Sequence, residues 1–173
     1  MIGIIFRNLL GYDLLILLLA AFAGFFVYPR AVKASDTLKG HLQPTLYIPI
    51  DVLLRQFQTN NREEIDLHRI KKLKDEEAKF VNMLMTIISV FPLMGILGTI
   101  ISLLGMVNLG SEEVLINFTT ALTSTFWGLV FAIGFKGMTT MLLAQNELNA
   151  ENFELLIKRV DMMNSSGGHY EEA

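Results

Sequence analysis

The chain has 173 residues and a formal net charge of −3, with 52% hydrophobic and 18% charged residues. Soluble domains average about 45–50% apolar and about 25% charged residues, so the composition is only moderately shifted. The distribution of charge is more informative, because Phe80–Ser111 and Val114–Phe135 contain no charged residue over 32 and 22 positions. A helix needs about 20 predominantly apolar residues to cross a bilayer. The sequence therefore excludes a soluble single-core domain and predicts an integral membrane protein.

The residue counts also exclude several kinds of site. Without cysteine, the chain has no disulfide, thiolate metal site or cysteine nucleophile. Its histidines, His41, His68 and His169, do not have the spacing of zinc ligands. The acidic net charge argues against nucleic acid as a partner, and the apolar stretches hold no nucleophile–base pair. We therefore expect neither an enzyme nor a cofactor.

The first predicted element is a transmembrane helix within residues 1–28. Leu14–Val27 is a continuous apolar run of 14 residues, flanked by Tyr12 and Tyr28 as by the aromatic belts of membrane spans. Residues 2–10 are also mostly apolar and can extend the helix. A cleaved signal peptide is the alternative. The proline and basic residues that directly follow the run are more typical of a stop-transfer flank.

Residues 29–79 are predicted to form a polar loop with short helices. Turn-forming residues make Pro29–Pro49 irregular, and Asp51–Phe57 can form a short helix. A longer helix begins near Arg62 and meets no helix breaker before Pro92, so we expect it to run directly into the second span. Opposite charges four residues apart support this helix. We interpret it as a solvated stalk, with a charged binding site as the alternative.

The rest of the chain predicts two further spans and a C-terminal helix. The second span covers residues 80–107, a hairpin covers 108–113, and the third span covers 114–136. Residues 137–163 have apolar side chains at helical intervals, which predicts an amphipathic helix that packs on the stalk. The tail, 164–173, has no apolar pattern and is expected to be disordered. The expected fold class is all-α, with three transmembrane helices, two of them long and extending into a cytoplasmic helical bundle.

The basic residues predict the orientation of the spans. Such residues stay on the cytoplasmic side of helix ends, and ten of the fourteen lie in Pro29–Lys79. The hairpin between the second and third spans has none and contains Glu112 and Glu113. We therefore expect the N-terminus outside and the polar loop and C-terminus in the cytoplasm.

Small and hydroxyl-bearing residues have an unusual arrangement in the second and third spans. Small residues four positions apart allow close helix contact in lipid, and Pro92 is expected to kink its helix. For most of the serine and threonine hydroxyls in these spans, a hydrogen bond to the backbone carbonyl group of the preceding helical turn is a sufficient explanation. Thr99 and Thr125 differ, because each lies midway along a narrow face that suits the lining of a constricted cavity. The residues expected to pack closely are Gly95, Gly98, Ala121, Gly128 and Ala132.

Two charged residues border the apolar runs. Lys136 directly follows the third run, and we interpret it as an interfacial lysine that reaches the lipid headgroups. A salt bridge with a partner or a gate at the inner mouth is the alternative. Asp13 precedes the first run, and we interpret it as a solvated residue at the outer end of the span, with a proton acceptor as the alternative.

The second and third spans resemble those of the ion-channel subunit family of ExbB, TolQ and MotA. FPLMGILGTIISLLGM, a short hairpin and FTTALTSTFWGLVFAIGF are similar to the family's Gly-Thr span followed by Ala-Leu-x-x-Thr-x-x-Gly-Leu. The likeness covers Phe91–Phe135. The three-span topology resembles ExbB and TolQ, whereas Thr125–Ala132 is more similar to MotA.

The resemblance implies a proton-conducting motor subunit of the bacterial inner membrane. Such subunits form pentamers around a single-span partner similar to ExbD, TolR or MotB, whose membrane aspartate carries protons. By motif position, Thr99 and Thr125 match the family's two pore-facing threonines. Thr120 stands where many ExbB- and TolQ-type members have a glutamate. The proton pathway implied in this way is lined by Thr99, Thr125, Thr120, Asn117 and Ser102.

The residues themselves agree with a division of labour between two subunits. Proton movement through a membrane interior needs a titratable relay or a continuous water path. Between Phe80 and Phe135 the only carboxylate side chains are Glu112 and Glu113, which belong to the hairpin. We therefore expect another subunit to supply the titrating group. The alternative function is a non-energised membrane scaffold or a small holin-like pore that needs no partner.

Overall fold

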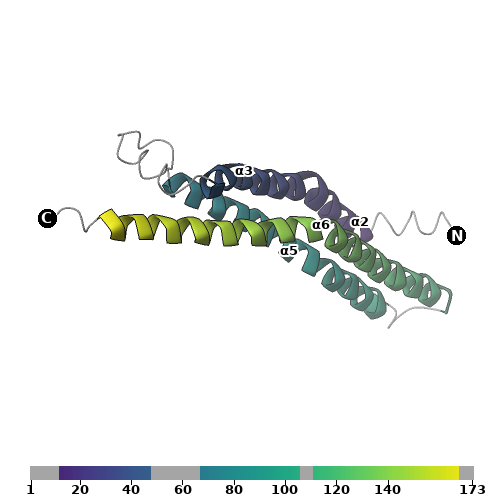
Figure 1. The fold of residues 1–173 in the computed structure, drawn as a ribbon. Coiled ribbons are helices and arrows are strands. Elements are labelled where there is room, and N and C mark those ends of the chain that lie inside the picture. Colours follow the sequence, from purple (N-terminus) through teal and green to yellow (C-terminus); the bar gives the residue numbers. More distant parts are fainter. Residues whose placement is uncertain (1–11, 48–66, 106–110, 168–173) are drawn as a thin grey trace. The chain divides into compact units, whose positions relative to one another are not determined.

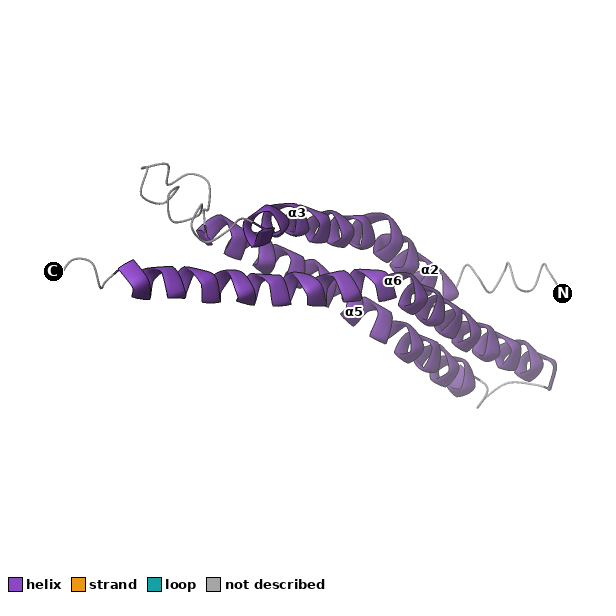
Figure 2. Cartoon of the chain, viewed as in Figure 1, coloured by secondary structure: helices purple, strands orange, loops and turns teal. Residues whose placement is uncertain are grey.

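The structure, a computed structural model, describes residues 12–47, 67–105 and 111–167, and these three segments are helical (Figures 1 and 2). Each segment contains a helix long and apolar enough to cross a membrane. The described part of the chain therefore confirms the expected all-α fold class with three candidate spans. The elements in chain order are α2 (Tyr12–Phe22), η1 (Ala23–Val27), α3 (Tyr28–Tyr47), α5 (Leu67–Leu104) and α6 (Ser111–Gly167).

The chain divides into two compact units, to both of which α3, α5 and α6 contribute. One comprises residues 1–30 and 82–140, and the other comprises 31–81 and 141–173. The first contains both long charge-free runs, and we call it the membrane unit. The second contains most of the charged residues, and we call it the charged unit.

The first long helix continues through Pro29, where the sequence predicted an irregular segment. A proline ring has no N–H and collides with the carbonyl group four residues earlier, which here belongs to Phe25. The turn before it, η1, is a wide π-helical turn in which the backbone N–H of Tyr28 donates to the carbonyl oxygen of Ala23. This wider turn accommodates the proline, and α3 follows without a break. The prediction of irregular structure is therefore wrong for residues 29–47.

Both later helices continue from a membrane span into the charged unit. α5 runs directly into the second span, as predicted, and Pro92 lies inside it, while the expected kink there stays a prediction. The expected start near Arg62 and the short helix at Asp51–Phe57 lie outside the described residues. α6 is a single helix where the sequence divides into a third span and an amphipathic helix. It also includes residues 164–167, so the expectation of disorder is wrong there, whereas 168–173 lie outside the described residues.

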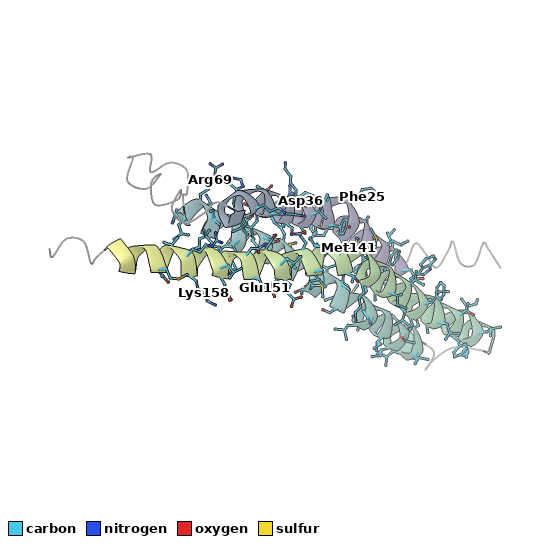
Figure 3. The ribbon with its side chains drawn as sticks, viewed as in Figure 1. Phe25, Asp36, Arg69, Met141, Glu151 and Lys158 are labelled. Atoms are coloured by element: carbon cyan, nitrogen blue, oxygen red, sulfur yellow. The ribbon has the colours of Figure 1, made fainter. Side chains whose placement is uncertain are left out.

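On α5, and over Ala121–Gly128 of α6, the buried positions of the membrane unit follow one another at spacings of three and four residues. This average spacing of 3.5 is the signature of interlocking helices. The opposite faces carry large exposed apolar side chains, among them Phe25 (Figure 3), as a surface in contact with lipid or another subunit requires. The buried positions are Leu84, Ile88, Phe91, Gly95 and Gly98 on α5, and Ala121, Ser124, Gly128 and Phe135 on α6.

The charged unit is a helical bundle in which α3, α5 and α6 surround an apolar core. Leu38 and Leu42 of α3 pack with Ile70 of α5 and Leu156 of α6. This arrangement agrees with the expected packing of the C-terminal helix on the stalk. Asp36, Arg69, Glu151 and Lys158 are exposed on this unit (Figure 3).

A buried polar network also connects the three helices of the charged unit. Ser35, Glu77 and Asn149 are at most 1% exposed. The Asn149 amide donates to Glu77 Oε1 at 2.7 Å and to the Ser35 carbonyl oxygen at 3.1 Å. Gln145 Nε2 donates to Asn149 Oδ1 at 2.9 Å, which fixes the orientation of the amide. Since buried polar groups are stable only when hydrogen-bonded, this network specifies how the three helices pair.

Asn149→Ala removes the amide that donates to the buried Glu77 carboxylate. Leaving a buried acceptor unsatisfied costs about 1–3 kcal/mol, so we expect a clearly lower thermal unfolding temperature by circular dichroism. Glu147→Ala, at an exposed position of the same helix, is the matched control and is expected to leave it unchanged. Equal unfolding temperatures for the two variants would contradict a stabilising role of the network.

Candidate functional site

The candidate site is a layer of polar side chains in the middle of the membrane unit, where α6 contacts both α2 and α5. Ser124 and Thr125 occupy the centre of the charge-free run Val114–Phe135. At a rise of 1.5 Å per residue, each lies about 15 Å from the ends of that run. This is half the thickness of the hydrocarbon core of a bilayer, about 30 Å. Gly95 is likewise central in Phe80–Ser111.

α5 and α6 are in backbone contact at this level. A Cβ atom on Gly128 would lie 2.6 Å from the Phe91 carbonyl oxygen and 3.1 Å from Gly95 Cα. A Cβ atom on Gly95 would lie 3.0 Å from Thr125 Cα. Glycine at both positions therefore permits an approach that any larger residue would prevent, and it brings the hydroxyl groups of the two helices within reach of one another.

Thr99 of α5 and Thr125 of α6 form a hydrogen-bonded pair across this contact. Their Oγ1 atoms are 2.9 Å apart, and both lie within reach of the Gly95 carbonyl oxygen, at 2.9 Å from Thr99 and 3.2 Å from Thr125. Each hydroxyl has one proton to donate. Either Thr125 donates to Thr99 and Thr99 to the carbonyl, or Thr99 donates to Thr125 and Thr125 to the carbonyl. The pair can reverse by rotation of two hydroxyl groups without any movement of the backbone.

A second polar contact at the same level joins α6 to α2. The Ser124 hydroxyl donates to Asp13 Oδ1, and both residues are at most 1% exposed. The interpretation of Asp13 as a solvated residue at the outer end of the first span is therefore wrong. The 14-residue apolar run placed it at a helix end, but the contact with Ser124 places it level with the centre of the third span. The expectation that another subunit supplies the titrating group stays a prediction.

The other residues expected along a proton pathway are partly buried on the same two helices. The Thr120 hydroxyl donates to the Ile116 carbonyl oxygen of its own helix at 3.0 Å. Asn117 and Ser102 are half-buried, and Asn117 Nδ2 would lie 3.5 Å from a Cβ atom on Gly105. Thr99 and Thr125 are therefore the two members of the expected set that the described contacts join directly.

The residues expected to pack closely fall into two groups. Gly98 and Ala121 are buried, as are Gly95 and Gly128. Ala132 is half-buried and lines a groove of about 350 Å³ between α5 and α6. The exposed Lys136 also lines this groove. The remaining lining residues are Met85, Ile88, Ser89, Pro92, Leu129 and Ile133.

Aromatic side chains pack beside the close contact of α5 and α6. The fully buried Phe91 stacks on Phe135, with ring centroids 5.6 Å apart, and contacts Phe131 at 5.8 Å. Trp127 stacks on Phe131 in turn. Aromatic pairs of this kind add about 0.5–1.5 kcal/mol each to area burial. The cluster therefore stabilises the helix pair over about three turns of α6 after Thr125.

Ser124 is a site residue that was not predicted from the sequence. Its neighbours Thr120, Thr123 and Thr125 have the same small hydroxyl character, so residue type alone does not distinguish it. The available signal was position, because Ala121, Ser124 and Gly128 have the three- and four-residue spacing of a buried helix face.

The described residues contain no group of three or more histidine, cysteine, aspartate or glutamate side chains placed to hold a metal ion. A family model described as the MotA/TolQ/ExbB proton channel family matches residues 47–155. No curated protein and no solved structure matches the chain significantly. The matched region includes the Gly95–Gly128 contact and the Thr99–Thr125 pair, whereas Asp13 precedes it.

Gly128→Ala is expected to destabilise the membrane unit, because its Cβ atom would meet the rigid Phe91 carbonyl group. Gly137→Ala, on the same helix, meets nothing within 4 Å. There alanine should be neutral or stabilising, since glycine costs about 0.5–1 kcal/mol in a helix interior. Thermal unfolding of the purified variants in detergent measures the difference. Equal effects at the two positions would contradict the close backbone contact.

Proposed function

The chain belongs to the MotA/TolQ/ExbB proton channel family, and from this we propose that it is the channel-forming subunit of a proton-driven motor of the cell envelope. In this proposal five copies surround a single-span partner similar to ExbD, TolR or MotB, and the second and third spans line the proton pathway. The Thr99–Thr125 pair at mid-membrane is the observation that carries it. The two hydroxyl groups, which the backbone contact at Gly95 and Gly128 brings together, provide a polar lining that carries no charge.

The chemistry of the two spans supports a wall of this kind. Phe80–Ser111 and Val114–Phe135 contain no charged residue, so they can hydrogen-bond a proton carrier but cannot titrate themselves. A charged carboxylate is expensive in the membrane interior, and hydroxyl groups can stabilise it there by donating hydrogen bonds to it. The partner's aspartate would be held at Thr99 and Thr125 when charged and released when protonated.

The energy available is sufficient for such a cycle. A proton that crosses about 150 mV releases roughly 3.5 kcal/mol. This is equivalent to a ratio of more than one hundred between two populations, since about 1.4 kcal/mol corresponds to a factor of ten. Each proton can therefore bias the movement of the partner from one subunit to the next.

The surface and the charge distribution support an oligomer in the bacterial inner membrane. Large apolar side chains such as Leu104, Leu115 and Ile133 are more than 65% exposed on α5 and α6, and neighbouring copies and lipid would cover them. The concentration of basic residues in the charged unit favours a cytoplasmic position for it, with the N-terminus outside. Lys136 would then lie at the inner end of the groove, near the lipid headgroups.

We expect Thr99→Val and Thr125→Ala each to lower proton flux by more than tenfold in liposomes that contain the chain and its single-span partner. Both changes remove a hydroxyl of the pair, and neither adds a charge or much volume. Thr86→Val on α5 and Thr119→Val on α6 are matched controls, because these hydroxyls bond to carbonyl groups of their own helices. The controls should conduct like the wild-type protein.

Assembly is measured on the same samples by the size of the purified complex. Full flux in the Thr99→Val/Thr125→Ala double variant would remove these residues from the pathway. Flux from the chain alone, as strong as that with the partner present, would contradict a titrating group supplied by the partner and would favour a simple pore.

A further inference from the structure

We infer that Asp13 is a proton-binding group of this chain itself, located at mid-membrane next to the proposed pathway. The inference rests on the proposed function for its physiological role. The proton-binding step itself stands on the burial, depth and hydrogen bonding of Asp13.

The depth of Asp13 follows from its partner. Ser124 lies ten residues after Val114 and eleven before Phe135, and its hydroxyl donates to the Asp13 carboxyl group. The apolar run Leu14–Val27 follows Asp13, and residues 2–10 before it are mostly apolar, with Arg7 and Asn8 as the polar exceptions. Its carboxyl group is therefore near the centre of the bilayer. An ionisable residue at such a depth is rare and is commonly part of an ion or proton path.

Among the described residues, the surroundings of Asp13 offer a neutral partner rather than a cation, and Arg7, six residues earlier in the chain, lies outside them. In the described part of the membrane unit, α5 carries no charged residue, and the partner from α6 is the Ser124 hydroxyl. Arg30 contacts the Phe26 ring at 3.6 Å and is 17 residues further along the helix than Asp13, about 25 Å away. The other charged residues of α6 in this unit are Lys136, Glu112 and Glu113, each at least eleven residues from Ser124, or more than about 16 Å along the helix.

Protonation of Asp13 would change the bonding of Ser124. An ionised carboxylate accepts hydrogen bonds only, whereas a protonated carboxyl group also donates one. The Ser124 hydroxyl has one proton and two acceptors within reach, Asp13 Oδ1 and the Thr120 carbonyl oxygen at 3.1 Å. It must donate to the carboxylate when Asp13 is charged, because an unpaired buried charge is very costly. When Asp13 carries a proton, the hydroxyl is free to donate to Thr120.

The same turn of α6 connects this group to the hydroxyl pair. Ser124 contacts α2 through its side chain, and Thr125, the next residue, contacts Thr99 and Gly95 of α5. A Cβ atom on Gly95 would also lie 3.2 Å from the Ser124 carbonyl oxygen. Packing at this level leaves little freedom, so a change at Ser124 acts on the position of Thr125. The chain would thus store a proton beside the pathway and adjust the pathway to it.

Infrared difference spectroscopy of the full-length oligomer in lipid tests the proton-binding step. We expect a carboxylic-acid C=O band that decreases as the pH rises and is absent in Asp13→Asn, which keeps the size and an acceptor oxygen but cannot titrate. Asp36→Asn, at an exposed position of the charged unit, should retain the band. The absence of any pH-dependent band that depends on Asp13 would overturn the inference.

Proton flux in liposomes with the single-span partner tests the role in transport. We expect at least a tenfold loss in Asp13→Asn, substantial recovery in Asp13→Glu, and a shifted pH profile in Ser124→Ala. Wild-type flux in Asp13→Asn would overturn the transport role and leave the proposed function intact. No flux from the wild-type complex, together with the Asp13 band, would instead refute the proposed function and leave proton binding by Asp13 standing. If Asp13→Asn does not assemble, the pH-dependent band in the wild-type protein, compared with Ser124→Ala, decides the question.

Discussion

The backbone contact between Gly95 and Gly128 is the constraint on which the membrane unit depends. A side chain at either position would collide with the opposite helix, and the nearest atoms are backbone atoms that cannot rotate away. At this separation the hydroxyls of Thr99 and Thr125 reach one another and share one carbonyl oxygen. A wider separation would leave each to bond to its own helix, as Thr120 and Thr119 do. The polar layer of Thr99 and Thr125 thus depends on the two glycines, which have no side chain, as much as on the hydroxyl groups themselves.

Consecutive residues of α6 serve two different helices at this level. Thr125 contributes to a pair of neutral hydroxyls that can exchange donor and acceptor roles, and such a pair binds protons only transiently. Ser124 donates to the carboxyl group of Asp13, for which we propose proton binding. Ser124 and Thr125 are adjacent on α6. A large shift of α2 would therefore disturb the contact of Thr125 with α5, and a large shift of α5 would disturb the contact of Ser124 with α2. The third span therefore couples Asp13, the proposed proton-binding group, to the hydroxyl pair of Thr99 and Thr125.

Much of this could be predicted from the sequence, and the failures have specific physical causes. The long charge-free runs predicted the spans, because the requirement for apolar residues in lipid is strong. The positions of Thr99 and Thr125 on faces of small residues predicted their special character, although residue spacing along one helix does not show which helix is opposite. Asp13 was misplaced because its partner is 111 residues away and the apolar run beside it is short. The helix through Pro29 was missed because a π-helical turn, which has no simple sequence signal, relieves the clash of the proline ring.

Among the described residues, each unit buries a carboxyl group against a neutral donor on α6, Glu77 in the charged unit and Asp13 in the membrane unit, and the two donors differ in their freedom to rotate. Glu77 accepts a hydrogen bond from the amide of Asn149. That amide also donates to Ser35 and accepts from Gln145, which fixes its orientation. Lys39 donates to Gln145 in turn. An amide held at both ends cannot reorient, so this network fixes the register of three helices. Asp13 accepts from a hydroxyl that has a second acceptor one turn away on its own helix. A rotatable hydroxyl between two acceptors can follow a change of charge, whereas a clamped amide resists it. The same chemical pairing therefore fixes the helices in the charged unit and permits a switch in the membrane unit.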